Sequence, residues 1–219
     1  MASPTTAIID YGMGNLRSVQ KALEAVGANA SIVSSPDQLN GADRLILPGV
    51  GAFGDGMEHL RQRDWPDAIN EFIATGKPFL GICLGMQLLF EGSEEDAPPE
   101  ADELVPGLGV MPGKVVRFEN EVGGQRIKVP HMGWNDIRWV RDNPLLTEVE
   151  QEAYVYFVHS YYAVPDETEE FPLTATLTDY PDGRPFCSSV MRGNVWATQF
   201  HPEKSQRVGL TILKNFATL

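Results

Sequence analysis

The chain has little of several features that mark large classes of protein. Its 219 residues include only two cysteines, Cys83 and Cys187, too few for a disulfide framework or a cysteine-based zinc site. The four histidines, at positions 59, 131, 159 and 201, show no metal-ligand spacing, so no metal is implied. These shortages favour a reducing, cytoplasmic setting.

Basic residues and long apolar runs are also scarce. Lys and Arg number 17 against 30 Asp and Glu, a net charge of −13, whereas nucleic-acid binding needs a basic surface. The longest apolar candidate, 79–90, is too short to span a bilayer and contains Gln87. Residues 1–8 show no basic region followed by a long apolar stretch, so no signal peptide is expected. We therefore expect neither nucleic acid nor a membrane as a partner.

The negative charge is concentrated in one segment. Seven acids and no base lie between residues 91 and 103, and Pro98, Pro99 and Pro106 interrupt the same region. This composition predicts a solvated, flexible acidic loop over 92–106. Residues 1–4 are expected to be disordered, and the whole chain, 1–219, to form one domain.

The order of predicted elements indicates an α/β fold. Strands are predicted over 5–10, 30–34, 44–47 and 78–82, and helices over 15–26, 56–61 and 65–75. Such alternation is typical of parallel βαβ units. The second half is mostly strands, over 110–118, 125–129, 137–140, 154–158, 173–178, 186–191 and 195–200. We predict a mostly parallel central sheet with flanking helices and an antiparallel β extension packed on it.

Cys83 lies in a G-x-C-x-G segment, Gly81 to Gly85, between the apolar run 78–80 and the helix-like stretch 86–90. The two glycines let the chain turn sharply, as in the nucleophile elbow of serine hydrolases. The N-terminus of a helix would favour the thiolate. A buried structural cysteine is the alternative, and the spacing alone does not decide between the two.

A second segment, His201-Pro202-Glu203, favours the reactive interpretation. It lies between a predicted strand, 195–200, and an amphipathic helix that opens at Ser205, and α/β proteins place their chemistry at such strand ends. An imidazole can deprotonate a thiol and later protonate a leaving group, and a carboxylate can orient the imidazole. His201 and Glu203 alone could form an exposed turn, but with Cys83 they predict a catalytic triad.

The glycine-rich stretch Gly49 to Gly54 matches G-x-G-x-x-G, which has two interpretations. A dinucleotide site would need this motif after the first strand and an acid at the end of the next strand. Here the motif follows a third strand, and the acid at the right distance, Glu71, lies in a predicted helix. Backbone N–H groups of this loop could instead stabilise an oxyanion beside Cys83.

Gly81 to Gln87 and Gln199 to Lys204 resemble the class I, triad-type glutamine amidotransferases. Four further segments make the chain similar to those glutaminase subunits that feed ammonia to a cyclase in histidine biosynthesis: 10–18, 48–53, 130–135 and 156–161. The resemblance implies hydrolysis of L-glutamine to glutamate and ammonia through a thioester on Cys83, with no cofactor. It also implies a heterodimer with the cyclase subunit, a (β/α)₈ barrel.

The resemblance assigns further residues to roles. It implies an oxyanion site at Gly51 and Leu84, with a loop peptide that reorients for full activity. It places the glutamine amino and carboxylate groups against Gln87, Glu95 (or Glu94), His159, Ser160 and Tyr161. The partner-facing positions are Asn15, Trp134, Tyr156 and Lys204. His159 could otherwise be a satisfied polar residue at a strand end, and the aromatic residues could be core anchors.

Other functions remain open at this point. The chain could be the glutaminase subunit of another amidotransferase, in anthranilate, purine or guanylate synthesis, although 10–18 and 131–135 disfavour this. A non-catalytic regulatory subunit of the same fold would be free to lose Cys83, His201 and Glu203. A cysteine hydrolase acting alone would leave the partner-facing aromatic residues unexplained. Cys187, in a predicted strand, is interpreted as structural.

Overall fold

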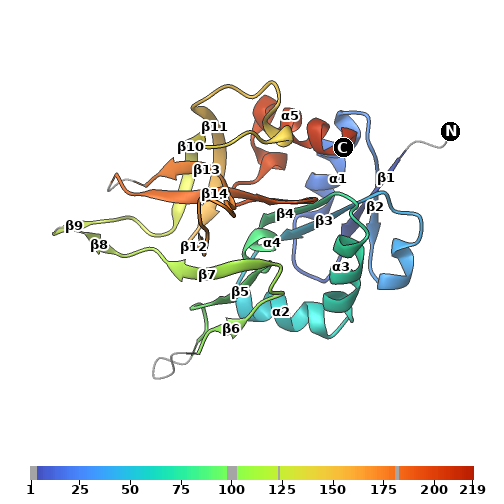
Figure 1. Ribbon diagram of the computed structural model, residues 1–219, viewed down its shortest axis with the longest axis horizontal. Helices are drawn as coiled ribbons and strands as arrows, with labels where there is room; N and C mark the ends of the chain where they lie inside the picture. The colour runs from blue at the N-terminus through green and yellow to red at the C-terminus, as the bar shows by residue number, and fades with distance from the viewer. Residues whose placement is uncertain (1–3, 98–102, 123, 181–182) are drawn as a thin grey trace.

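The computed structural model describes residues 4–97, 103–122, 124–180 and 183–219, drawn as a ribbon in Figure 1. The first half alternates strands and helices as predicted. Its elements are β1 (Thr5–Ile9), α1 (Leu16–Ala25), β2 (Asn29–Val33), the 3₁₀ turn η1 (Pro36–Leu39), β3 (Arg44–Gly49), α2 (Phe53–Arg61), α3 (Trp65–Ala74) and β4 (Phe79–Cys83). All four strands pair in parallel, in the order β4-β3-β1-β2.

The second half is mainly antiparallel and joins the same sheet. Its further elements are β10 (His131–Trp139), η2 (Pro144–Leu146), β11 (Ala153–His159), β13 (Thr174–Asp179), β14 (Pro185–Arg192), β15 (Val195–Thr198), η3 (Pro202–Lys204) and α5 (Gln206–Thr218). The nine strands run in the order β11-β10-β13-β14-β15-β4-β3-β1-β2, and β15 pairs in parallel with β4. The predicted α/β class is confirmed, but this part of the extension continues the central sheet instead of packing on it.

A second, four-stranded sheet was not predicted. It contains β5 (Phe90–Ser93), β6 (Val105–Pro106), β7 (Met111–Arg117) and β12 (Tyr161–Pro165), in the order β12-β7-β5-β6, and a short hairpin of β8 (Glu121–Val122) and β9 (Gln125–Arg126) projects beside it. The predicted end of the helix over 86–90 is wrong. Helix α4 (Leu84–Gln87) ends at Gln87, and Phe90 instead belongs to a strand, where it pairs with Met111.

The predicted acidic loop is narrower than 92–106. Gly92 and Ser93 belong to β5 and are buried, and Val105 and Pro106 pair with them as β6. Pairing with β7 and β6 outweighs the local preference of this acidic segment for solvent. Residues 98–102, like residues 1–3 of the predicted disordered terminus, lie outside the described part of the chain.

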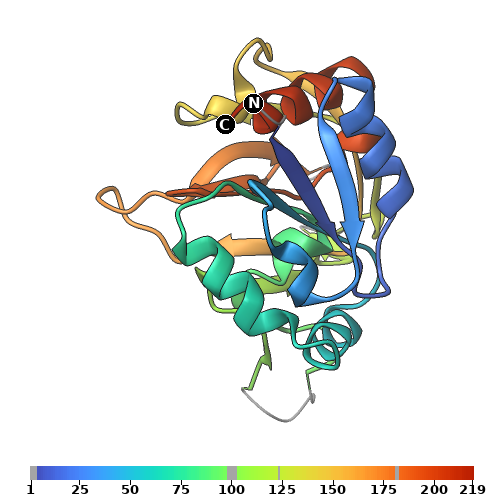
Figure 2. The same cartoon turned by 90° about the vertical axis from the view of Figure 1, so that its right-hand side faces the viewer.

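The core lies on both faces of the central sheet. Leu45 and Leu47 of β3 pack with α2 and α3, whereas Ile46 of the same strand packs with α1 and α5. Strands covered on both faces need apolar residues at every position, which explains the continuous apolar runs of the first half. Figure 2 shows the two helix pairs on opposite sides of the sheet. Within the described residues, no helix is both long and apolar enough to cross a membrane.

The turn between β4 and α4 depends on its two glycines. A Cβ atom on Gly85 would lie 1.8 Å from the carbonyl oxygen of Leu47, and one on Gly81 would lie 2.7 Å from the carbonyl oxygen of Gly85. Neither approach is possible for a larger residue, since both contacts are to backbone. The glycines thus allow α4 to fold back against β3 directly after Cys83.

This close approach predicts the effect of adding one methyl group. We expect Gly85→Ala to lower the free energy of unfolding by about 3 kcal/mol or more, because the strand and the turn must separate. Gly54→Ala is the control: it lies in the first turn of α2 and would meet only the Asp96 side chain, at 3.2 Å. Its effect should stay within about 1 kcal/mol. Urea denaturation measures both, and a similar small change in the two variants would contradict the prediction.

Candidate active site

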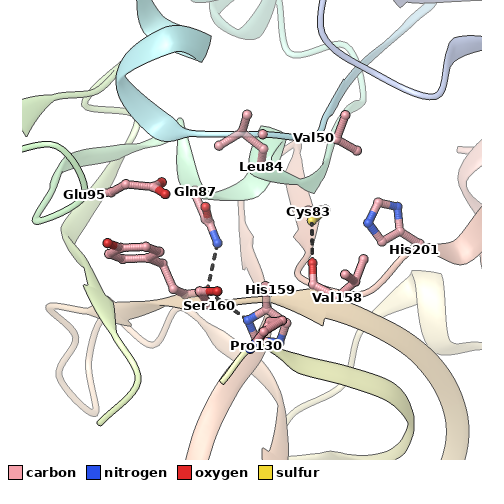
Figure 3. A pocket seen from close by; sticks show the side chains of 12 residues that line it. Val50, Cys83, Leu84, Gln87, Glu95, Pro130, Val158, His159, Ser160 and His201 are labelled. Carbon is pink, nitrogen blue, oxygen red and sulfur yellow. Dashed lines mark hydrogen bonds between the residues drawn. The ribbon is translucent and has the colours of Figure 1, made fainter. Parts of the chain in front are cut away.

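Cys83 ends β4 with an unusual backbone conformation. Its φ is +54° and its ψ is −110°, outside the regions that non-glycine residues normally adopt. Such strain is stored at sites where a side chain must be presented in one direction. The turn directs the thiol of Cys83 into a pocket, where its sulfur lies 4.0 Å from the carbonyl oxygen of Val158 (Figure 3).

His201 and Glu203 lie where β15 leads into α5, and both side chains are buried. The Nδ1 atom of His201 is 2.8 Å from Oε1 of Glu203. Burial lowers the pKa of His201, but Cys83 and Glu203, as anions, outweigh it and raise this pKa to about 10. Within the described residues, Nε2 of His201 has no hydrogen-bond partner. A protonated imidazole beside Glu203 is the form of His201 that this shift favours.

One pocket of about 300 Å³ brings the predicted residues together. Cys83 and His201 face each other across it (Figure 3). Its lining residues are Val50, Gly51, Cys83, Leu84, Gln87, Glu95, Pro130, Val158, His159, Ser160, Tyr161 and His201. Every residue predicted for the oxyanion site and for substrate binding is in this set, and Glu203 lies behind His201. The segments that meet here are far apart in the chain.

Helix α4 supplies less electrostatic support than the sequence predicts. It has only four residues, Leu84 to Gln87, so few peptide dipoles add up at its N-terminus. Leu84 and Gly51 nevertheless line the same pocket as Cys83. Gly51 has a φ of +103°, which a residue with a side chain rarely adopts. With a short helix, His201 becomes the main positive charge near the sulfur.

Glu95 is fixed although it lies in the acidic segment. Its Oε2 atom accepts a hydrogen bond of 2.8 Å from the backbone N–H of Phe53, at the start of α2. Burial raises the pKa of Glu95 and nearby Asp96 and Asp55 add to this, while the Phe53 N–H opposes it. Glu94 instead pairs with Lys114 on the surface, 2.9 Å away. Of the two acids considered from the sequence, Glu95 is the one in the pocket.

Two side chains, those of Gln87 and His159, hold the loop 159–161 through the carbonyl oxygen of Tyr161. Nε2 of Gln87 donates to the carbonyl oxygen of Tyr161 over 2.9 Å, and Nδ1 of His159 lies 2.8 Å from the same oxygen. The other ring nitrogen of His159 is 3.0 Å from Nδ1 of His131. Because both ring nitrogens are occupied, His159 could meet a substrate through its backbone but not through its ring.

Two buried polar side chains next to the pocket residues, His131 and Gln199, were not identified from the sequence. His131 is buried against His159, and burial lowers the pKa of His131 to about 4. Burial, with charge from His131 and His201, lowers the pKa of His159 to about 3. Gln199 is fully buried and contacts both Cys83 and Gln87. Gln199 lies at the end of a predicted strand, two residues before His201. Because residues two apart along a strand point to the same face, this spacing could have indicated that Gln199 belongs to the site.

Two of the predicted partner-facing residues, Trp134 and Tyr156, belong to an apolar patch on β10 and β11. Met132, Trp134 and Tyr154 are 56%, 45% and 59% exposed, and Trp134 pairs with Tyr156 across the strands. Lys204 places its Nζ atom 5.8 Å from the centre of the Tyr156 ring. The patch adjoins the pocket, since the Tyr156 carbonyl accepts the His201 N–H over 3.0 Å.

Two predicted roles at other positions can also be placed. Asn15 directly precedes α1, which packs against η3 beside His201, and its side chain accepts a hydrogen bond from Ser18. Cys187 is buried in β14, where burial raises its pKa to about 12. Such a thiol is unreactive, in agreement with a structural role. No cluster of metal-ligating side chains occurs in the described ranges.

Comparison with known proteins identifies the family. Residues 7–218 match the family model described as "Glutamine amidotransferase class-I". The chain is 51% identical over 214 residues to the "Imidazole glycerol phosphate synthase subunit HisH" of Syntrophotalea carbinolica, covering 97% of this chain and 98% of the relative. It is 50% identical over 215 residues to the protein of the same name from Geobacter sulfurreducens, covering 97% and 98%.

Solved structures share the fold at low sequence identity. "Structure of PurLQS from Thermotoga maritima" gives a TM-score of 0.71 at 20% identity and covers 99% of each chain. "Crystal structure of glutamine amidotransferase" gives a TM-score of 0.69 at 22% identity and covers 97% of this chain and 99% of its own. At these identities the likeness supports the architecture alone.

The buried pair of His131 and His159 predicts acid sensitivity. An unfolded histidine has a pKa of about 6.5, so below that pH the unfolded chain binds protons that the folded pair excludes. The free energy of unfolding should fall as the pH is lowered from about 6.5 to about 4. His131→Phe should reduce the slope over this range, as measured by urea denaturation. An unchanged slope would contradict the prediction.

Proposed function

The chain belongs to the class I glutamine amidotransferase family, and from this membership we propose that it is the glutaminase subunit of an imidazole glycerol phosphate synthase. The observation that carries the proposal is the pocket that holds Cys83 and His201 together, with Glu203 behind His201. The names of relatives about 50% identical over nearly the whole chain support the choice of synthase.

The first half of the proposed reaction forms a thioester. The sulfur of Cys83 attacks the side-chain amide carbon of L-glutamine, and the C–S bond forms as the carbonyl electrons move to oxygen. Backbone N–H groups at Gly51 and Leu84 stabilise this oxyanion. The protonated His201 then gives its proton to the nitrogen, the C–N bond breaks, and ammonia leaves.

The second half releases glutamate. A water molecule attacks the thioester carbon while His201, held by Glu203, takes the proton of that water. The C–S bond breaks, the electrons return to sulfur, and the Cys83 thiolate is restored. Gln87, Glu95 and the loop 159–161 hold the amino and carboxylate groups of the substrate through both steps. No organic cofactor or metal takes part in the proposal.

The ammonia needs a receiver, because in neutral water it becomes the non-nucleophilic ammonium ion. We assign that role to the cyclase subunit, a (β/α)₈ barrel bound as a heterodimer, which makes imidazole glycerol phosphate and the aminoimidazole carboxamide ribonucleotide in L-histidine biosynthesis. The patch of exposed Met132, Trp134 and Tyr154 with half-buried Tyr156 supports this, since exposed apolar patches mark protein interfaces. The proposal includes a cytoplasmic location and a place near this junction for Asn15.

Substitution of the triad tests the chemistry. We expect Cys83→Ala to lower glutaminase activity by more than about a thousandfold, because no thioester can form. Glu203→Gln should lower kcat by about a hundredfold, since the imidazolium loses its stabilising carboxylate. Cys187→Ala is the matched control and should retain activity. Glutamate release, measured with the cyclase subunit present, gives each value; full activity of Cys83→Ala would refute the mechanism.

Addition of the cyclase subunit tests the choice of pathway. Glutaminase activity should rise when that subunit is added, and rise further with its nucleotide ligand. Trp134→Ala should raise the Kd for the cyclase subunit about tenfold or more, because a central aromatic anchor is lost. Phe171→Ala, an exposed aromatic outside β10 and β11, is the matched control and should leave the Kd unchanged. No binding of the native chain would contradict the assignment.

A further inference from the structure

Gln199 is a fully buried polar residue directly after β15. A primary amide has two N–H donors and one oxygen acceptor. Burial of such a group is unfavourable unless these atoms find hydrogen-bond partners, because water is lost. The partners of the Gln199 amide therefore indicate its role.

The amide connects the candidate nucleophile with the substrate pocket. Its Nε2 atom donates to the sulfur of Cys83 over 3.7 Å. Its Oε1 atom accepts a hydrogen bond of 2.9 Å from Nε2 of Gln87. The same nitrogen of Gln87 donates to the carbonyl oxygen of Tyr161 over 2.9 Å. One side chain thus contacts the sulfur and, through Gln87, the loop that lines the pocket.

The direction of these hydrogen bonds is set by the backbone. The carbonyl of Tyr161 can only accept, so Gln87 must turn its NH₂ group toward it. That NH₂ group also faces Gln199, which must therefore present its oxygen to Gln87. Its own NH₂ group is then left facing Cys83, and a half-turn of the amide would place oxygen against sulfur and nitrogen against nitrogen. The sulfur is consequently always met by a donor.

We propose that Gln199 is a hydrogen-bond donor to Cys83 that stabilises its thiolate, and that the same side chain positions Gln87 in the pocket. A thiolate accepts hydrogen bonds far better than a thiol, so a donor that cannot rotate away favours the charged form. The proposal rests on the proposed function for the reaction that this thiolate serves. The hydrogen bonds themselves belong to the resting protein and can be tested without substrate.

The other titratable groups around the sulfur are separate from this amide. His201, which is hydrogen-bonded to Glu203, and His159 both line the pocket. Burial raises the pKa of Tyr11, and the charge on nearby Cys83 raises the pKa of Tyr11 further. Among the described residues, the hydrogen bonds of the Gln199 side chain go only to Cys83 and Gln87. A substitution at Gln199 therefore changes the environment of the sulfur without removing a titratable neighbour.

Two substitutions of similar volume separate the two parts of the proposal. Gln199→Met removes both hydrogen bonds, whereas Gln199→Glu keeps an acceptor toward Gln87 and places an oxygen against the sulfur. The rate of iodoacetamide alkylation of Cys83 is measured against pH in a Cys187→Ala background. We expect the midpoint of this profile to move up by about one pH unit in Gln199→Met and further in Gln199→Glu.

Steady-state kinetics give a second, independent readout. Gln199→Met should raise the KM for glutamine about tenfold, because Gln87 is no longer held toward the loop. Gln199→Glu should leave this KM close to native while kcat falls, because its effect falls on the sulfur. A role in packing alone would lower the Tm of both variants without separating KM from kcat.

Controls make the outcome specific. Thr176→Val removes another buried polar group, bonded to Ser188 and Ser189 outside the pocket, and should lower the Tm without moving the alkylation midpoint. Native midpoints in folded Gln199→Met and Gln199→Glu would overturn the proposal. The proposed function would instead be overturned if the native chain released no glutamate, even with the cyclase subunit. In that case a shifted midpoint in the variants would still support the role of Gln199.

A measurement on the otherwise native chain covers the case in which these variants do not fold. The side-chain amide resonances of Gln199 should move in Cys83→Ala, since one N–H group loses its acceptor. They should also exchange slowly with solvent in the native protein, because the amide is buried and bonded. Unchanged resonances in Cys83→Ala would overturn the proposal.

Discussion

The whole site depends on the turn that ends β4, where Cys83 adopts a positive φ. The turn is possible only because Gly81 and Gly85 let two backbone segments touch, so that α4 lies against β3. This contact brings the sulfur, the Leu84 N–H and the glycine-rich loop after β3 to one edge of the sheet. Strain at one residue is thereby supported by the packing of the surrounding core.

A second constraint is the burial of polar groups around that turn. Gln87, Gln199, His131, His159 and His201 are all buried, and each has a hydrogen-bond partner among the described residues. In a buried network each donor must face an acceptor, so the orientation of one group fixes the next. The backbone carbonyl of Tyr161 thus determines which atom of a distant amide meets the Cys83 sulfur.

The exposed patch and the pocket share one strand. The backbone of Tyr156 in β11 accepts from the His201 N–H and donates to the Ser205 hydroxyl, while its ring lies on the surface beside Trp134 and Lys204. A displacement of β11 would therefore reach His201 through one hydrogen bond. This continuity gives a physical route by which a bound subunit could influence the chemistry.

The sequence by itself determined the class of fold and predicted the three side chains of the candidate triad. These predictions came from local patterns: the alternating apolar runs, the glycines beside Cys83 and the His201–Glu203 spacing. Such patterns involve only residues close together in the chain, so they can be recognised without knowledge of tertiary contacts. Only the tertiary structure decided that α4 stops after four residues, that β5 and β12 form a second sheet, and that Gln199 and His131 belong to the site. Strand pairing and buried hydrogen bonds join residues far apart in the chain, and no local pattern encodes such partners.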